Sequence, residues 1–178
     1  MAYRVVIVGG GAAGMQTALE LKSRGIEPII VERDVELGGK ARGWHKLFPS
    51  FTPAGDIMQP IAQRVKDEHI RCFYGQEVTG IASDGVTLRS EERIPADAVV
   101  VATGFTLFDA HRKQEYGYGL YDNVITSVDL ERMMNGGRVT LTDGSEPKRI
   151  AILHCVGSRD EKVGQKHCSK VCCITGVK

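Results

Sequence analysis

The sequence has almost no net charge and no long apolar run. Its 23 basic and 22 acidic side chains leave a net charge of +1, so no long-range field attracts a phosphate backbone or an anionic membrane. We therefore expect no nucleic-acid partner. No apolar run approaches the roughly 20 residues that cross a bilayer, and the apolar N-terminal segment lacks a basic leader and a small-residue cleavage site. These absences predict a cytoplasmic protein without a membrane span.

Cysteine is also scarce, with five among 178 residues. An odd number cannot all pair, and in a reducing compartment clustered cysteines are more often metal ligands or redox groups than structural disulfides. No two of them have CxxC spacing, so a disulfide relay of the thioredoxin-reductase kind is not expected. Four of the five lie within residues 155–173, spaced C-x12-C-x3-C-C.

The chain opens with a strand pattern followed by a glycine loop. Residues 4–8 form a β-branched apolar run without alternation, which is typical of a strand buried on both faces of a parallel sheet. Gly9, Gly11 and Gly14 then fit GxGxxG. In this motif the first glycine permits a tight turn, the second lets the backbone reach a pyrophosphate, and the third lets a helix pack on the strand.

A helix and a second buried strand complete this first unit of the pattern. MQTALELKSRG has helical periodicity and ends at Gly25, and EPIIVE reads as a strand that ends at Glu32. Glu32 lies 18 positions beyond Gly14, where a carboxylate can accept hydrogen bonds from an adenosine ribose. The order of strand, glycines, helix, strand and acid predicts a dinucleotide site. The helix residues expected to face inward are Ala13, Thr17, Ala18 and Leu21.

The middle of the chain predicts a β-meander and a further parallel strand. A helix is expected over residues 57–69, with Pro60 in its first turn, and Cys72 beyond it is expected to be a small buried hydrophobe. Short strands with polar turns follow and close on an apolar strand over residues 98–101. The predicted fold class is α/β: a Rossmann-like domain with a parallel sheet and a β-meander, followed by the start of a second α/β domain.

A second glycine pair indicates which dinucleotide is bound. GGKARG begins at Gly38, and the whole pattern from GxGxxG to this pair resembles the FAD-binding half of the glutathione reductase and thioredoxin reductase superfamily. Free backbone amides at Gly39 and Lys40, with the Lys40 charge, are expected to meet the diphosphate from the far side. The resemblance implies FAD contacts at Gly9, Gly11, Ala12, Ala13, Gly14, Glu32, Arg33, Gly39, Lys40, Val78 (near adenine), Ala102, Thr103 and Gly104.

The cysteine group follows a predicted strand over residues 150–153 and lies at the start of a predicted helix. Four thiolates match a cubane, which takes one sulfur ligand per iron. Zinc also accepts four thiolates, but its structural sites usually show C-x2-C pairs. We predict a [4Fe-4S] cluster; zinc, a redox disulfide and inert thiols are the alternatives. His69, His111 and His154 have no partner at metal-ligand spacing and are expected to be solvated or hydrogen-bonded. The predicted ligands are Cys155, Cys168, Cys172 and Cys173.

Three segments, DNVITSVDLERMMNGG, PKRIAILHCVGSRDE and HCSKVCC, resemble the flavoprotein A subunit of heterodisulfide reductases. They also resemble its shorter relatives in the quinone-interacting and Hdr-like sulfur-oxidising complexes. The resemblance covers nearly the whole chain and implies an oxidoreductase subunit that passes electrons between FAD and a [4Fe-4S] cluster. It further implies partner subunits of a heterodisulfide-reductase-like complex, needs no catalytic proton-transfer residue, and leaves a homodimer open.

The expected domains are an FAD-binding domain over residues 1–105, a connecting segment over 106–148, and the start of a second domain over 149–178. Because the chain stops at Lys178 as a helix begins, we expect a fragment. One alternative function is an FAD- or NAD(P)-dependent pyridine-nucleotide-disulfide-type oxidoreductase with a structural zinc site. Another is a nucleotide-binding assembly protein that only scaffolds its partners.

Overall fold

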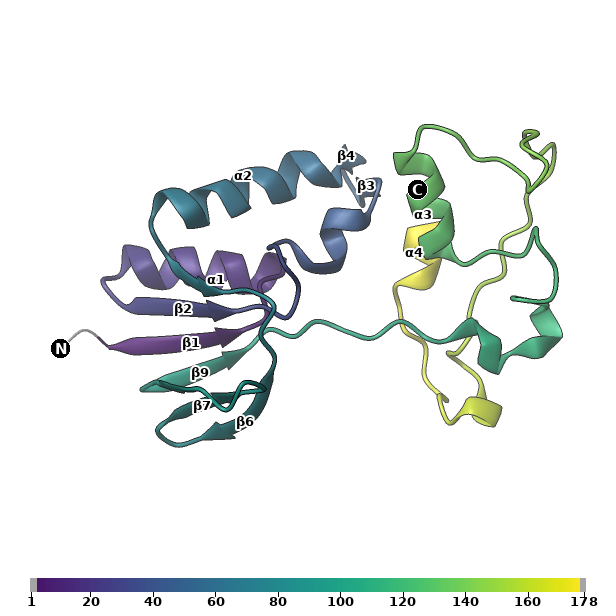
Figure 1. The fold of residues 1–178 in the computed structure, drawn as a ribbon. Coiled ribbons are helices and arrows are strands. Elements are labelled where there is room, and N and C mark those ends of the chain that lie inside the picture. Colours follow the sequence, from purple (N-terminus) through teal and green to yellow (C-terminus); the bar gives the residue numbers. More distant parts are fainter. Residues whose placement is uncertain (1–2, 177–178) are drawn as a thin grey trace. The chain divides into compact units, whose positions relative to one another are not determined.

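The computed structural model describes residues 3–176, which form two compact units (Figure 1). The first unit extends to Arg42 and resumes over Ala54–Phe105. The second contains Gly43–Pro53 and the chain from Thr106 onwards. The sequence did not predict that Gly43–Pro53 belongs with the later residues. The domain boundaries at residues 105 and 148 stay predictions.

The first unit is built on a four-stranded parallel sheet with strand order β5-β2-β1-β9. The strands predicted over residues 4–8 and 98–101 are present as β1 and β9, and the α/β fold class is confirmed. Val6 at the centre of the sheet pairs with Ile29 on one side and Val99 on the other. The strands are β1 (Arg4–Val8), β2 (Glu27–Val31), β5 (Arg71–Phe73) and β9 (Ala98–Val101).

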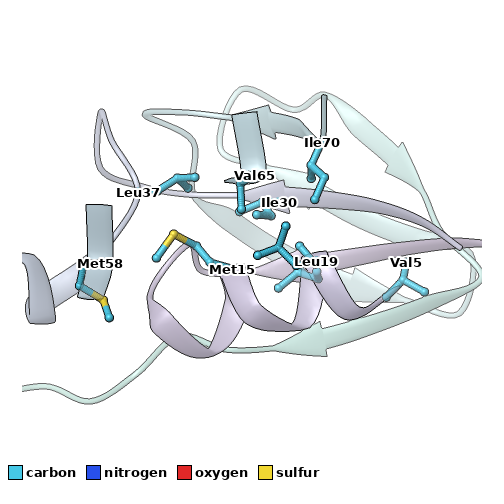
Figure 2. Close-up of a cluster of buried hydrophobic side chains, with 10 residues drawn as sticks. Val5, Met15, Leu19, Ile30, Leu37, Met58, Val65 and Ile70 are labelled. Atoms are coloured by element: carbon cyan, nitrogen blue, oxygen red, sulfur yellow. The ribbon is translucent and has the colours of Figure 1, made fainter. Parts of the chain in front are cut away.

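Two helices, α1 (Ala12–Ser23) and α2 (Ala54–Asp67), cover one face of this sheet (Figure 1). Their contact with the sheet is a cluster of fully buried apolar side chains, several of which are drawn in Figure 2. Burying such side chains stabilises the unit by about 1.5–3 kcal/mol each. The cluster contains Val5, Ile7, Met15, Ala18, Leu19, Ile30, Leu37, Met58, Val65 and Ile70.

The inward face of α1 differs from the predicted one. Met15, Ala18 and Leu19 are buried, whereas Ala13 is exposed and Thr17 is only half-buried. The reason is local, because Gly14 must lie against the backbone of Gly9 and this contact turns the next residues inward.

The start of α2 also differs from the prediction. The helix begins at Ala54, so Pro60 lies in its interior and not in its first turn. Pro60 is on the exposed side, where a missing backbone donor leaves a carbonyl that water can reach.

A three-stranded antiparallel meander covers the other face of the sheet. Its strands are β6 (Val78–Ala82), β7 (Gly85–Leu88) and β8 (Arg93–Pro95). The second buried cluster joins sheet and meander through Val6, Ile29, Val31, Val86, Leu88 and Ile94. Since both faces of β1 and β2 are covered, these strands carry apolar residues at every position after the first and show no alternation.

The second unit consists of short elements linked by loops. The helices are α3 (Ser127–Asn135) and α4 (Cys172–Gly176), and β3 (Lys46–Leu47) pairs with β4 (Thr52–Pro53). The unit also has the turns η2 (Ala110–Arg112), η3 (Gln114–Tyr116) and η4 (Glu161–Val163), whereas η1 (Gly39–Gly43) begins at the last glycine of the second glycine pair. Two hydrogen bonds tie Gly43–Pro53 to α3: His45 N–H donates to Glu131 Oε2 at 2.6 Å, and Asn135 Nδ2 donates to the Gly43 carbonyl at 2.8 Å.

The strand predicted over residues 150–153 is wrong. These residues form no strand, and Ile150, Ile152 and Leu153 are 62 %, 50 % and 61 % exposed. A strand needs a neighbour to pair its backbone groups. In the described part of the second unit the strands are the two-residue β3 and β4, so this apolar run has no sheet to join. The helix predicted from Cys168 begins only at Cys172, as α4, so Cys168 and Ser169 precede it; Lys178 lies outside the described residues.

Across residues 3–176, none of the helices combines the length and apolar character needed to cross a membrane.

Candidate functional site: a glycine cradle and a thiol cluster

The first glycine loop is shaped by contacts that exclude side chains. Gly9 has φ +108°, and a Cβ there would overlap the carbonyl oxygen of Ala102. A Cβ on Gly14 would overlap the carbonyl oxygen of Gly9. At Gly11, in contrast, a Cβ would meet nothing within 4 Å. Gly11 therefore faces open space, which a side chain would fill and a ligand can use.

The N-terminus of α1 opens from this loop. Gly11 is its N-cap and offers no side-chain cap, and the first turn contains no acidic residue. Ala12 and Ala13 are exposed. The first amides of a helix have no intrahelical acceptor and carry partial positive charge, so this 12-residue helix presents an anion site.

The second glycine pair lies directly beside the first loop. Gly38 N–H donates to the Gly10 carbonyl at 2.9 Å, and Gly38 forms an isolated parallel bridge with Gly11. Gly38 and Gly39 have φ values of +114° and +53°, and a Cβ on Gly39 would lie 3.2 Å from the Gly11 Cα. Two backbone turns thus meet without side chains between them and form a cradle. We call Gly9–Gly14 with Gly38 and Gly39 the glycine cradle.

Glu32 holds the first loop in place. Its side chain is buried, with Oε2 accepting from Gly10 N–H at 2.6 Å and Oε1 accepting from Asp34 N–H at 2.8 Å. The sequence predicted only a ribose acceptor here, whereas the structure adds a role in fixing the loop. Each carboxylate oxygen can accept two hydrogen bonds, so both retain capacity for a ligand hydroxyl.

Except for Val78, the remaining residues predicted to contact the dinucleotide lie on segments that follow β2 and β9. Ala102 N–H donates to the Val8 carbonyl at 2.8 Å, and Thr103 and Gly104 after it are exposed. Lys40 Nζ lies 5.2 Å above the ring of Phe105, within range of a cation–π interaction. The carboxyl ends of β1, β2 and β9 therefore share one edge with the glycine cradle, as ligand sites in open α/β sheets do.

Arg33 and Val78 are placed differently from each other. Arg33 follows Glu32 and is exposed, whereas Val78 begins β6 and pairs with Leu88. Gln76 N–H donates to the Glu32 carbonyl at 3.0 Å. The chain leading to Val78 thus passes beside the end of β2.

The cysteines of the second unit act on one another. Hydrogen bonds from the Cys155 backbone and the Ser169 hydroxyl lower the pKa of Cys172. The charge of Cys172 is the main cause that raises the pKa of Cys173, and Cys155 and Cys168 add to it. The Cys168 sulfur accepts from Lys170 N–H at 3.3 Å. Neighbouring thiolates repel, and a bound cation or cluster relieves that repulsion. We call these four cysteines the thiol cluster.

Residue spacing predicted no metal-ligand partner for His154, but the structure places its imidazole beside two thiols. Its ring nitrogen and the sulfurs of Cys172 and Cys173 all lie within 4.8 Å of one another. Two local features bring the imidazole there. Cys155 has φ +62°, and Gly176 leaves room for the ring, since a Cβ there would lie 2.5 Å from His154 Cε1. The contact with α4 is non-local, so residue spacing could not reveal it.

Cys72, the fifth cysteine, belongs to the first unit and packs against the helix-side core. It is half-buried, and burial raises the pKa of its thiol. Cys72 was expected to be a small buried hydrophobe; it packs against the apolar core as expected but is only half-buried.

A buried lysine anchors the loop that joins Cys155 to Cys168. Lys113 is 4 % exposed, and its Nζ lies 2.5 Å from Asp160 Oδ2 and 2.6 Å from Glu115 Oε1. Hydrogen bonds to Asp160 and then Glu115 raise the pKa of Lys113. Asp160 and Gln165 exchange backbone hydrogen bonds of 2.7 and 3.0 Å that close the loop. The sequence held no signal for Lys113, because Asp160, one of its two partners, lies far along the chain.

A glycine cradle at the carboxyl edge of a parallel sheet defines a dinucleotide-binding α/β protein of the Rossmann type. The family model described as pyridine nucleotide-disulphide oxidoreductase matches residues 3–153, and the chain belongs to that family.

The chain is similar to the curated A subunits of heterodisulfide reductases, and the resemblance seen in the sequence is confirmed. The A subunit of the H(2):CoB-CoM heterodisulfide,ferredoxin reductase from Methanothermobacter marburgensis is 44% identical over 261 residues, covering 96% of this chain and 40% of that protein. The A subunit of the Ferredoxin:CoB-CoM heterodisulfide reductase from Methanosarcina mazei is 38% identical over 159 residues, covering 85% of this chain and 19% of that protein. The chain therefore spans about a fifth to two fifths of these relatives.

Among solved structures, the chain is similar in fold to Lactococcus lactis thioredoxin reductase in its FR conformation. The TM-score is 0.54 at 22% identity, covering 65% of this chain and 41% of that one. This likeness supports the fold alone.

Proposed function

We propose that this chain is an electron-transfer segment of a heterodisulfide-reductase-like flavoprotein, with FAD in the glycine cradle and a [4Fe-4S] cluster on the thiol cluster. The observation that carries the proposal is the pairing of two kinds of site in one chain. The first unit offers a side-chain-free cradle next to exposed helix amides. The second offers four thiols, of which Cys173 has its pKa shifted by the charges of the other three.

The cradle residues fit the parts of FAD that they would hold. The amides of the first turn of α1 would bind the diphosphate from one side, and those of Gly39 and Lys40 from the other. Glu32 would accept the ribose hydroxyls with the lone pairs left after its two backbone hydrogen bonds. The residues we assign to FAD are Gly9, Gly11, Ala12, Ala13, Gly14, Glu32, Arg33, Gly39, Lys40, Val78, Ala102, Thr103 and Gly104.

The thiol cluster fits a four-iron cluster because Cys155, Cys168, Cys172 and Cys173 supply one thiolate per iron. The lowered pKa of Cys172 favours the thiolate that binds metal. When bound, FAD supplies two-electron chemistry and the cluster one-electron steps. The chain itself contributes the positions, hydrogen bonds and charges around each centre, and no side chain needs to transfer a proton.

The relatives named above belong to heterodisulfide reductases. On that basis we propose that this chain exchanges electrons with other subunits of such a complex, in the cytoplasm. A homodimer is the alternative assembly.

The test is iron, acid-labile sulfide and flavin content of anaerobically purified protein, with its ultraviolet-visible spectrum. We expect about four irons per chain and one FAD. Cys172→Ser should lose iron and keep flavin, whereas the matched control Cys72→Ser should keep both, because Cys72 packs in the first unit. Zinc in place of iron would favour the alternative of an oxidoreductase with a structural zinc site, and iron retained by Cys172→Ser would contradict the ligand assignment.

A further inference from the structure

The imidazole of His154 and the thiols of Cys172 and Cys173 lie close together at α4. A cubane held by four thiolates needs no imidazole at this place. The donor atoms of His154, Cys172 and Cys173 lie within 4.8 Å of one another, and no other three metal-binding side chains within residues 3–176 do so. We propose that His154, Cys172 and Cys173 form a site for a single divalent transition-metal ion such as Zn²⁺ or Co²⁺.

The distances suit a single ion. With Zn–S bonds of about 2.3 Å and Zn–N bonds of about 2.0 Å, tetrahedral geometry sets donor atoms roughly 3.5–3.8 Å apart. Donors that lie within 4.8 Å of one another need to approach by only about 1 Å to reach this spacing. A cubane instead binds each thiolate to a different iron, which spreads the sulfurs further apart.

The donor types and their exposure also suit such an ion. Thiolate and imidazole together select zinc and metals of similar softness. His154 and Cys173 are exposed and Cys172 is half-buried, so an ion can enter from solvent. These three protein donors fill three of the four tetrahedral positions.

The sequence provides an internal control for His154. The dipeptide His-Cys occurs twice, at residues 154–155 and 167–168. Only the first histidine is brought to the α4 thiols, in the space left by Gly176. His167 instead offers its backbone carbonyl, which accepts from Arg159 N–H at 3.1 Å.

This inference goes beyond the proposed electron-transfer function. The two thiols of α4 would serve two metal states: a cluster with Cys155 and Cys168, and a single ion with His154. The single-ion site needs neither FAD nor Cys168.

The test is Co²⁺ titration of the full 178-residue chain, stripped of metal and kept reduced without oxygen. We expect one Co²⁺ per chain, with thiolate-to-cobalt charge-transfer bands and the visible bands of tetrahedral cobalt. His154→Ala should weaken binding by about 100-fold or more, the upper end of what even an outer-shell partner contributes to metal affinity. His167→Ala should bind as the wild type does, and equal binding by His154→Ala would overturn the inference.

Two further variants separate this site from the four-thiolate cluster. Cys168→Ser should keep cobalt affinity and lose iron on cluster reconstitution, whereas His154→Ala should do the reverse. Cobalt binding lost in Cys168→Ser would overturn the single-ion site. His154→Cys should restore cobalt binding with a stronger charge-transfer band, which excludes misfolding as the cause of loss in His154→Ala. Wild type that binds cobalt but assembles no iron would leave this site standing and remove the proposed cluster.

Discussion

The first unit buries mainly apolar side chains, whereas the buried side chains in the described part of the second are charged. All of the fully buried apolar residues found within residues 3–176 belong to the first unit. In the described part of the second unit, the buried side chains of the polar and charged class are Lys113 and Glu131. The first unit therefore has the hydrophobic core that stabilises a domain by itself, whereas the described part of the second is held by ion pairs and helix caps. The glycine cradle is preformed, whereas we propose that the thiol cluster becomes rigid only when it binds metal.

The largest expected effect comes from metal removal. Because metal binding contributes directly to folding where the core is small, chelation of the metal-loaded chain should abolish amide protection in the second unit. Protection of β1, β2 and α1 should persist. Hydrogen exchange followed by mass spectrometry checks this peptide by peptide. Equal loss of amide protection in both units would contradict the proposal that a hydrophobic core stabilises the first unit and metal binding the second.

The next effect distinguishes two glycines of the cradle. Gly14→Ala forces a Cβ onto the carbonyl oxygen of Gly9, so we expect about 3 kcal/mol or more of destabilisation from overpacking. Gly11→Ala meets no atom within 4 Å and should leave stability within about 0.5 kcal/mol while abolishing flavin binding. Denaturant unfolding and flavin content measure the two effects. A stable Gly14→Ala protein would show that the contact is not needed.

A smaller effect is expected at the ion pairs of the second unit. Lys113→Met leaves the carboxylates of Asp160 and Glu115 without their cation, which should loosen the loop between Cys155 and Cys168. We expect faster iron loss to a chelator and unchanged flavin content. Lys166→Met is the matched control, because its contact with Glu161 is exposed and 3.7 Å long.

The pH dependence of the second unit follows from the same residues. The ion pair with Lys113 lowers the pKa of Asp160, so its stabilisation is complete above the unfolded value of about 3.9 and is lost as pH falls through the folded one. The pKa of Lys113 is raised, so its stabilisation is complete below about 10.4 and is lost as pH rises through the folded value. Iron retention should therefore be constant across neutral pH and decline in acid. In Asp160→Asn that acid decline should be smaller, which chelator kinetics at several pH values would show.

The sequence predicted the structure of the first unit better than that of the second. In the first unit, β1, the glycine loop, α1 and β2 are contiguous, so local periodicity and glycine spacing predicted them. The predicted buried face of α1 was right at Ala18 and wrong at Ala13, because the contact of Gly14 with Gly9 turns Gly14 and Met15 inward. In the second unit, an apolar run over residues 150–153 predicted a strand, but a strand also needs a neighbour that the local sequence does not reveal.

The candidate sites divide in the same way. The residues of the cradle follow strand ends, so their spacing in the sequence pointed to one edge of the sheet. His154 and Lys113 reach their partners across non-local contacts. No pattern of spacing could have found them, although the repeated His-Cys dipeptide was a visible hint.

The existence of two separate centres is best tested by the iron and flavin content of Gly11→Ala and Cys172→Ser, measured side by side with the wild type. If the cradle binds FAD and the thiol cluster binds iron, Gly11→Ala keeps about four irons and loses flavin, and Cys172→Ser keeps flavin and loses iron. Loss of both cofactors in either variant, or of neither in both, would contradict the assignment of FAD to one unit and iron to the other.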